Sequence, residues 1–442
     1  MIVLYLIISV IVIILLTVRL KVHPFIALLL VALVYGFVSG MSSADIITSV
    51  NEGFGNTLGG IGLIIILGII IGAFLENSGG AYAIAEKVLK IIGKNRVPTA
   101  MGLIGWFVSI PVFADSGFLL LSPLNRSLSK KAKITLAGSA IALALGLTAS
   151  HTMVPPTPGP IAAAGILGAD LGLVLAVGIP VSLIALIFGI IFAKKFASKT
   201  YIDPNPQISD EQLKIRSANA PGALKSSMPV VIPILLIVLR SVIKAMDGLN
   251  GVFVDFILFV GEPFIALLIG VFLSLFLPKK LEKEMLSTTG WVGKSLSDAA
   301  SIILITGAGG IFGKVLQNSG IAGVLGDTLA GLNLSIWLPF ILAAAIKTAQ
   351  GSSTVALITT ASIMAPLMDK LGFSDSLEKA MVVIAIGAGS AVVSHANDSF
   401  FWVVTQMSGM DVRMGYRMQS LGTFVLGTSA ALTLFIAHLI LN

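Results

Sequence analysis

Short polar motifs occur twice in this apolar chain, in the same order and at nearly constant spacing. Residues 75–79, Leu-Glu-Asn-Ser-Gly, return as Leu-Gln-Asn-Ser-Gly at residues 316–320, which lie 241 positions further along. Three more pairs occur at offsets of 235, 244 and 241 positions: Ala114–Gly117 with Ala349–Ser352, Ser150–His151 with Ser394–His395, and Ala169–Asp170 with Met410–Asp411. The matched order predicts two homologous halves. In an apolar chain, such halves are typical of secondary transporters whose site lies between the repeats.

The composition indicates that the fold is built for a lipid bilayer. Of the 442 residues, 56% are hydrophobic and only 11% are charged, whereas soluble domains carry about 25% charged residues. The long apolar blocks lack the alternation of strands, so we expect a helical bundle rather than a β-barrel. The net charge of +7 lies largely in short loops and indicates orientation, not nucleic-acid binding. Because the chain has no cysteine, disulfide and thiol chemistry are excluded.

Basic residues in the loops predict how the chain crosses the membrane. The stretch 1–18 has no basic region before its apolar part, which predicts a membrane helix rather than a cleaved signal. Arg19 and Lys21 place the next loop in the cytoplasm, so the N-terminus is predicted to lie outside. Both flanks of the stretch 99–128 are basic, which a single crossing does not satisfy. A re-entrant hairpin that enters and leaves on the cytoplasmic side does satisfy it.

The expected fold is therefore an all-α polytopic membrane protein of two inverted repeats. The first repeat is predicted at 1–193 and the second at 228–442, with a cytoplasmic linker at 194–227 between them. We expect about ten transmembrane helices, two re-entrant helical hairpins and two broken helices, with the C-terminus outside. The hairpins are predicted at about 99–128 and 335–368, the second by symmetry, and the broken helices at about 134–168 and 380–408.

Polar and helix-breaking residues interrupt four apolar stretches, and these interruptions predict the site. Four prolines lie between positions 155 and 160, where each interior proline would cost a continuous helix about 3 kcal/mol. Such breaks create helix ends at membrane depth, and helix N-termini favour carboxylates. The predicted substrate-binding residues are Ser116, Gly117, Thr152, Lys347, Gln350, Gly351, Ser352, Ser353, Thr354, Asn397 and Ser399. The predicted ion-coupling residues are the intramembrane ionisable groups Asp115, His151, His395 and Asp398.

Structural roles compete with these assignments at several positions. Lys347 is expected either to meet the substrate carboxylate, to snorkel, or to pair with a buried acid. Asp398 is expected either to couple transport or to cap the next helix half, and Asp170 and Asp411 are expected to cap helix starts.

Two further expectations concern the third span, predicted at 60–75. Asn51 and Glu52 precede it, and we interpret them as the end of an interfacial helix. The glycines of this region, which include Gly59, Gly60 and Gly62, predict close packing of helices.

Three longer motifs surround the polar residues described above. One runs Ala-Gln-Gly-Ser-Ser-Thr-Val-Ala over 349–356 and is followed by Ala365-Pro366; another runs Ser-His-Ala-Asn-Asp-Ser over 394–399 and is followed by Phe401-Trp402. The third combines His151 with the proline-rich residues 154–160. Together they resemble the gluconate permease (GntP) family of ion-coupled symporters over most of the chain. The resemblance implies the ion-transporter superfamily architecture, with a moving transport domain and a dimerising scaffold, and hence a homodimer.

The chain departs from that family's pattern at three positions that bear on substrate. The family usually has glutamate where Asp115 stands, a second histidine where Thr157 stands, and arginine where Lys347 stands. The resemblance therefore supports a carrier of sugar acids or hydroxy acids rather than of gluconate in particular.

We predict a proton-coupled symporter of the cell (inner) membrane that takes up a small hydroxylated monocarboxylate by alternating access. Its partners would be the organic anion, the coupling proton and membrane lipid, and no cofactor is expected. Coupling to sodium is the near alternative, because hydroxyl, amide and backbone oxygens also ligate that ion. A membrane-embedded enzyme using histidine and aspartate is a weaker alternative. A passive channel, which would carry flux without accumulation, is opposed by the predicted hairpins.

Overall fold

The computed structural model describes residues 2–93, 96–205, 220–246, 249–321 and 334–441, and within these ranges the regular structure is helical. The helices before the linker are α1 (Ile2–Ile14), η1 (Leu15–Arg19), α2 (Pro24–Val38), α3 (Ser43–Asn77), α4 (Gly80–Ile92), α5 (Val97–Val108), α6 (Ala114–Lys131), α7 (Leu136–Met153), α8 (Pro158–Leu167), α9 (Leu171–Lys195) and η3 (Ala197–Lys199). Those after it are α11 (Ala223–Ala245), α12 (Val252–Val260), α13 (Pro263–Ser274), η4 (Lys283–Leu286), α14 (Trp291–Asn318), α16 (Trp337–Gln350), α17 (Ser353–Met364), η5 (Ala365–Leu367), α18 (Ser376–Ser390), α19 (Ser399–Ser408), α20 (Val412–Gly415), η6 (Tyr416–Ser420) and α21 (Leu421–Leu441).

Six helical segments of the described chain are long and apolar enough to cross a membrane. The number rises to seven if α12 and α13, which meet at a bend of 67°, form one crossing. Shorter apolar helices, among them α2 and α5, accompany these spans. The expected all-helical membrane fold is therefore confirmed, while the figure of about ten crossings and the inverted arrangement of the halves stay predictions.

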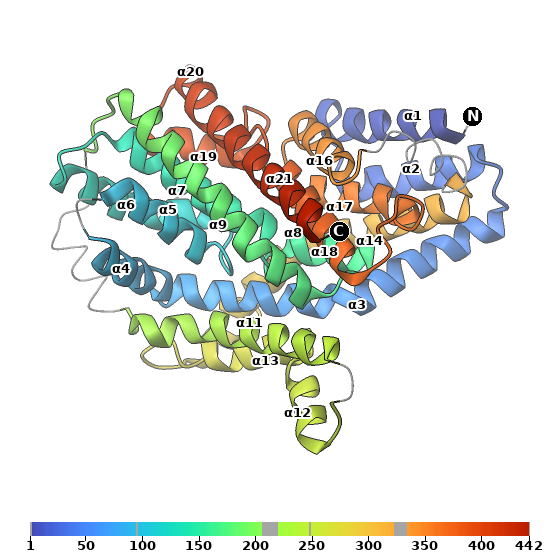
Figure 1. The fold of residues 1–442 in the computed structure, drawn as a ribbon, viewed down its shortest axis with the longest axis horizontal. Coiled ribbons are helices and arrows are strands. Elements are labelled where there is room, and N and C mark those ends of the chain that lie inside the picture. The colour runs from blue at the N-terminus through green and yellow to red at the C-terminus, as the bar shows by residue number, and fades with distance from the viewer. Residues whose placement is uncertain (1, 94–95, 206–219, 247–248, 322–333, 442) are drawn as a thin grey trace.

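Two long helices, α3 and α14, pack against each other along much of their length (Figure 1). Gly53 on α3 approaches the backbone of Gly310, and at the other end Phe74 packs edge-on against Trp291. These pairs show that the two helices run antiparallel. Helix α2 packs against α14, and α13 packs against α3. We call α2, α3 and α14 the long-helix layer.

A second group of helices, α7, α8, α17 and α18, forms the centre of the molecule. In an apolar stretch of 18 residues within α7 and α8, 94% of the stretch is buried inside the protein. Gly159 in α8 faces Leu357 of α17, where a Cβ on the glycine would collide with the leucine side chain. This close contact allows α8 and α17 to lie side by side.

Each of the four polar stretches identified in the sequence contains a helix break. The chain leaves helical geometry at 109–113 between α5 and α6, and at 154–157 between α7 and α8. It does so again at 351–352 between α16 and α17, and at 391–398 between α18 and α19. The break at 154–157 lies where the prolines at 155–160 predicted one, because interior prolines are costly in a helix.

Helix capping follows the sequence expectation at two positions. The Asp170 carboxylate accepts hydrogen bonds from the Gly172 and Leu173 amides at 2.9 and 3.0 Å, and so begins α9. The Asp411 carboxylate accepts one from the Met414 amide at 2.7 Å at the start of α20.

The linker begins in contact with the helical body. The Arg126 guanidinium of α6 donates hydrogen bonds to the carbonyls of Pro204, at 2.7 Å, and Met407. Residues 206–219 of the predicted linker lie outside the described residues.

Two expectations about α3 are wrong. Asn51 and Glu52 do not end an interfacial helix, because α3 continues without a break from Ser43 to Asn77, and Glu52 pairs instead with Lys314 across the layer. Gly59 and Gly60 do not pack closely, since an added Cβ at either would meet nothing within 4 Å, and at Gly62 it would meet only its own helix.

Candidate functional site

A cavity of about 230 Å³ lies where the helix breaks meet. Twelve of the fifteen predicted site residues line it: Asp115, His151, Thr152, Lys347, Gln350, Gly351, Ser352, Ser353, Thr354, Asn397, Asp398 and Ser399. The remaining wall includes Phe113, Thr148, Ser394 and Phe400, which were not among the predicted site residues. Residues from both halves of the chain therefore form one enclosure.

Three helices begin at this cavity. The first residues of α6, α17 and α19 all line it. Ser352 caps α17 by accepting a hydrogen bond from the Val355 amide at 3.3 Å, and Asp398 caps α19 by accepting one from the Phe400 amide at 3.0 Å. Helix N-termini carry partial positive charge and free N–H donors. The cavity is thus suited to an anion at a point where the surrounding protein is largely apolar.

A buried ion pair closes one side of the cavity. The Lys347 ammonium donates to the Asp398 carboxylate at 2.8 Å and to the Gly351 carbonyl, and the lysine side chain is only 2% exposed. Asp398 also accepts the Ser394 hydroxyl at 2.5 Å. Burying either charge alone would be costly, and the pair with its hydrogen bonds offsets that cost. Of the three roles expected for Lys347, the structure shows the ion pair with a buried acid. Asp398 also caps a helix, as expected.

Asp115 has no cationic partner of this kind. It lies in the first turn of α6, and its nearest side-chain hydrogen bond comes from the Ser399 hydroxyl at 3.5 Å. Among the described residues, no ion pair includes Asp115. The ionised cavity therefore holds two carboxylates and one ammonium, with the helix N-termini as the remaining positive potential.

The other polar side chains differ in how far they are already satisfied. The Thr152 and Ser353 hydroxyls donate to the carbonyls of Thr148 and Ser390 at 3.0 and 2.9 Å. The Asn397 amide donates to the backbone at 348–349, which ties the α18–α19 break to α16. By contrast, Nδ1 of His151 is buried without a hydrogen-bond partner in the described structure.

Three predicted residues do not line the cavity. The Ser116 hydroxyl hydrogen-bonds to Glu76 of α3, and Gly117 lies against the Leu147 side chain. Nε2 of His395 lies 2.7 Å from the Thr348 carbonyl, and its ring stacks on Tyr416. His151 and His395, which the repeated motifs predict to be equivalent, therefore have different surroundings.

Glu76 is a polar contact of the first hairpin that the sequence analysis did not assign to the site. It hydrogen-bonds to Ser116 and lies within electrostatic range of Asp298 on α14. Its membership in the repeated motif at 75–79 was the available signal.

Comparison with known proteins identifies the family. The family model described as "GntP family permease" matches residues 1–440. The chain belongs to the GntP permease family. This GntP family permease is 35% identical to a gluconate permease of Pseudomonas aeruginosa, with 92% of this chain and 90% of the relative covered. It is also 32% identical to the Gnt-II system L-idonate transporter of Escherichia coli, with 87% of each chain covered.

A solved structure supports the fold of the permease. The YdaH transporter of Alcanivorax borkumensis, whose crystal structure is described as having an unusual topology, superposes with a TM-score of 0.64 at 12% identity. The match covers 93% of this chain and 97% of that one. At this identity the likeness bears on the fold alone. A multi-pass protein of the inner membrane is consistent with the family and with the apolar helices.

Proposed function

We propose that this permease takes up a small hydroxylated monocarboxylate, such as gluconate or a related sugar acid, together with a proton. Relatives at 32–35% identity include proteins named for gluconate and for L-idonate, which supports this substrate class. The convergence of three helix N-termini on the cavity supports an anionic ligand. Serine, threonine and amide side chains around it supply the partners that substrate hydroxyls require.

The unpaired carboxylate of Asp115 is the observation that carries the proposal. With Lys347 neutralised by Asp398, an incoming monocarboxylate would meet a second, uncompensated negative charge in an enclosed space. Two such charges repel strongly where water is scarce. A proton on Asp115 would remove the repulsion and turn the residue into a donor for the substrate. Substrate binding and proton binding would then favour each other, which is the basis of symport.

Stoichiometry decides which gradient supplies the energy. One proton that accompanies one monoanion moves no net charge, so only the pH gradient would drive uptake. A second proton would add roughly 2.3 kcal/mol per 100 mV of membrane potential. The proposed cycle is alternating access, with the residues of the cavity exposed first on one side and then on the other.

Uptake by proteoliposomes tests the proposal. Labelled gluconate, idonate, glycerate and lactate would be offered with an imposed proton gradient or an imposed sodium gradient. Accumulation of at least one of these acids that depends on the proton gradient is the expected result. Accumulation only with sodium would replace the proton by that ion, and equilibration without accumulation under either gradient would indicate a channel.

A further inference from the structure

We propose that a second polar cavity, in the long-helix layer, is a separate binding site for the hydroxy-acid anion, with Lys314 as its carboxylate partner. The inference rests on the proposed function for the identity of the ligand. The cavity has a volume of about 300 Å³ and shares no lining residue with the candidate site. This volume is at the lower end of small-molecule sites, which suits a compact sugar acid.

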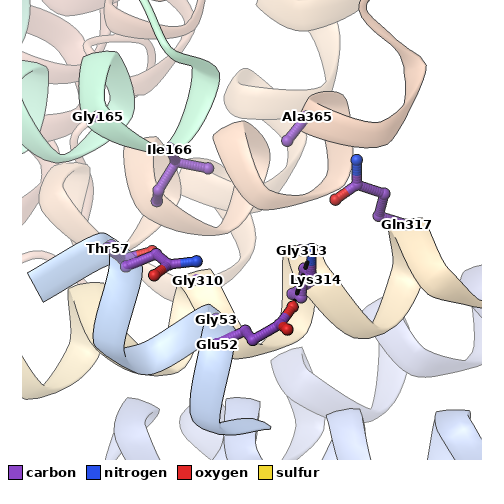
Figure 2. Close-up of a pocket in the computed structure, with 11 residues that line it drawn as sticks. Glu52, Gly53, Thr57, Gly165, Ile166, Gly310, Gly313, Lys314, Gln317 and Ala365 are labelled. Carbon is purple, nitrogen blue, oxygen red and sulfur yellow. Dashed lines mark ion pairs between the residues drawn. The ribbon is translucent and has the colours of Figure 1, made fainter. Parts of the chain in front are cut away.

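The wall formed by α3 and α14 is polar, although both helices are apolar overall. Glu52, Asn56 and Thr57 project from α3, and Lys314 and Gln317 project from α14. Figure 2 shows Glu52 and Lys314 joined across the two helices, with Ile166 and Ala365 on the opposing wall. Polar side chains at the cavity surface of membrane helices are costly unless they meet water, each other or a ligand.

The second cavity and the candidate site lie at opposite ends of one helix. Ser353 and Thr354, at the start of α17, line the candidate site, and Ala365, just past its end, lines the second cavity. A helix of 12 residues is about 18 Å long. Glu52 lies toward the start of α3, the end that the loop charges predict to be outside. The second cavity therefore lies on the predicted outer side of the candidate site.

Lys314 is available to an anion in a way that Lys347 is not. The Lys314–Glu52 contact is 3.2 Å, and the two side chains are 30% and 48% exposed. Exposed ion pairs of this kind are weak, so displacement of Glu52 from Lys314 by a substrate carboxylate costs little. Lys347, by contrast, is 2% exposed and already donates to Asp398 and to the Gly351 carbonyl.

The neighbouring side chains match the rest of a hydroxylated acid. The amides of Asn56 and Gln317 each offer donors and an acceptor, and the Thr57 hydroxyl offers both. Besides the Lys314–Glu52 pair, the cavity thus offers several neutral hydrogen-bonding groups for the hydroxyls of a polyhydroxy monocarboxylate.

Two substitutions with opposite expected effects test the site. In proteoliposomes of known orientation, Lys314→Gln should raise the KM for gluconate at the outer face about fivefold, the size expected for a solvent-reached ion contact. Glu52→Gln should lower that KM, because it removes the internal competitor. The KM at the inner face should stay unchanged in both. Lys294→Gln, on the same helix, is the matched control.

A purely structural ion pair predicts that both substitutions act in the same direction, and this result would overturn the site. Changes of equal size at both faces, or no change, would also overturn it. Absence of uptake of all four acids by the unmodified protein would count against the proposed function instead. If another of the four acids is the one taken up, the same KM comparison is made with that acid.

A labelling experiment examines the cavity without transport. Because the chain has no cysteine, Gln317→Cys introduces a single thiol into the cavity. We expect potassium gluconate to slow its reaction with a membrane-impermeant thiosulfonate, and potassium chloride at the same concentration to have no such effect. Asp369→Cys, at an exposed position after α17 on the predicted outer side, is the control position. Equal labelling rates with gluconate and chloride would show that the cavity does not bind this acid.

Discussion

Asp115 is the residue on which proton coupling depends in the proposed mechanism. Asparagine at this position has the shape of the protonated acid but cannot release a proton. Asp115→Asn should therefore abolish accumulation driven by a proton gradient while it preserves exchange of labelled for unlabelled substrate. That exchange should no longer respond to pH. Paired uptake and counterflow measurements on the same proteoliposomes check both expectations.

The control for this prediction is Asp369→Asn, which changes an exposed acid away from the cavity. It should behave as the unmodified protein does. If Asp115→Asn still accumulates substrate against its gradient, Asp115 has no part in coupling.

The pair of Lys347 and Asp398 makes a different prediction, about stability. Removal of one member of a buried pair typically costs about 3–5 kcal/mol, because the other charge is left without a partner. Lys347→Met and Asp398→Asn should each lower the melting temperature in detergent. The double variant should lose less than the sum of the two single losses, since it leaves no uncompensated charge. Strictly additive losses would mean that the pair does not hold the two helices together.

At the residue scale, the sequence indicated which polar residues lie within apolar stretches. It did not indicate which groups those residues contact. Asp115 and Lys347, which are polar residues in apolar stretches, line the same cavity in the structure, and their roles in transport stay predictions. Whether Lys347 would meet substrate or an acid depended on how α16 and the α18–α19 break pack, which no local pattern encodes. The same limit explains His395, whose partner is the carbonyl of Thr348.

At the scale of elements, close approach in α3 is confined to particular glycines. A Cβ on Gly72 would collide with the Pro111 carbonyl at the α5–α6 break, whereas one on Gly59 would meet nothing within 4 Å. Gly72→Ala should therefore lower the free energy of unfolding by about 1–3 kcal/mol through overpacking. Gly59→Ala is the matched control on the same helix and should be neutral or stabilising. Thermal unfolding of both variants in detergent tests the difference, and equal melting temperatures would contradict it.

Helix breaks were predictable because their causes are local. Four prolines within residues 155–160 are incompatible with a continuous helix, whereas more widely spaced prolines are accommodated inside α6, α9 and α11. The glycines of α3 were not predictable in this way, because glycine favours close packing only where a neighbouring backbone arrives. The prediction that Glu52 ends an interfacial helix was wrong for the same reason. A polar residue at the end of a helix and one that pairs with a neighbouring helix have the same local sequence.

At the scale of the molecule, two glycines that the repeated motifs predict to be equivalent have different contacts. Gly72 and Gly313 lie 241 positions apart, the offset of the repeated motifs. Gly72 meets the break of the first hairpin, at Pro111, whereas Gly313 meets the middle of α17, at Ser362. If the halves exchange these arrangements during transport, the break at 351–352 must slide toward Gly313. Ten residues of helix separate Ser352 from Ser362, so the movement would be about 15 Å.

This movement predicts a change of neighbours at Gln317. In the arrangement described, Gln317 and Ala365 line the same cavity, so the cysteine pair Gln317→Cys with Ala365→Cys should cross-link. The pair Gln317→Cys with Ser352→Cys should cross-link only in the opposite-facing state, in which the candidate site lies closer to the second cavity. Locking this second pair should stop uptake, and reduction should restore it; the cysteine-free chain supplies a clean background. Sustained uptake by a fully cross-linked second pair would exclude the exchange of arrangements between the halves.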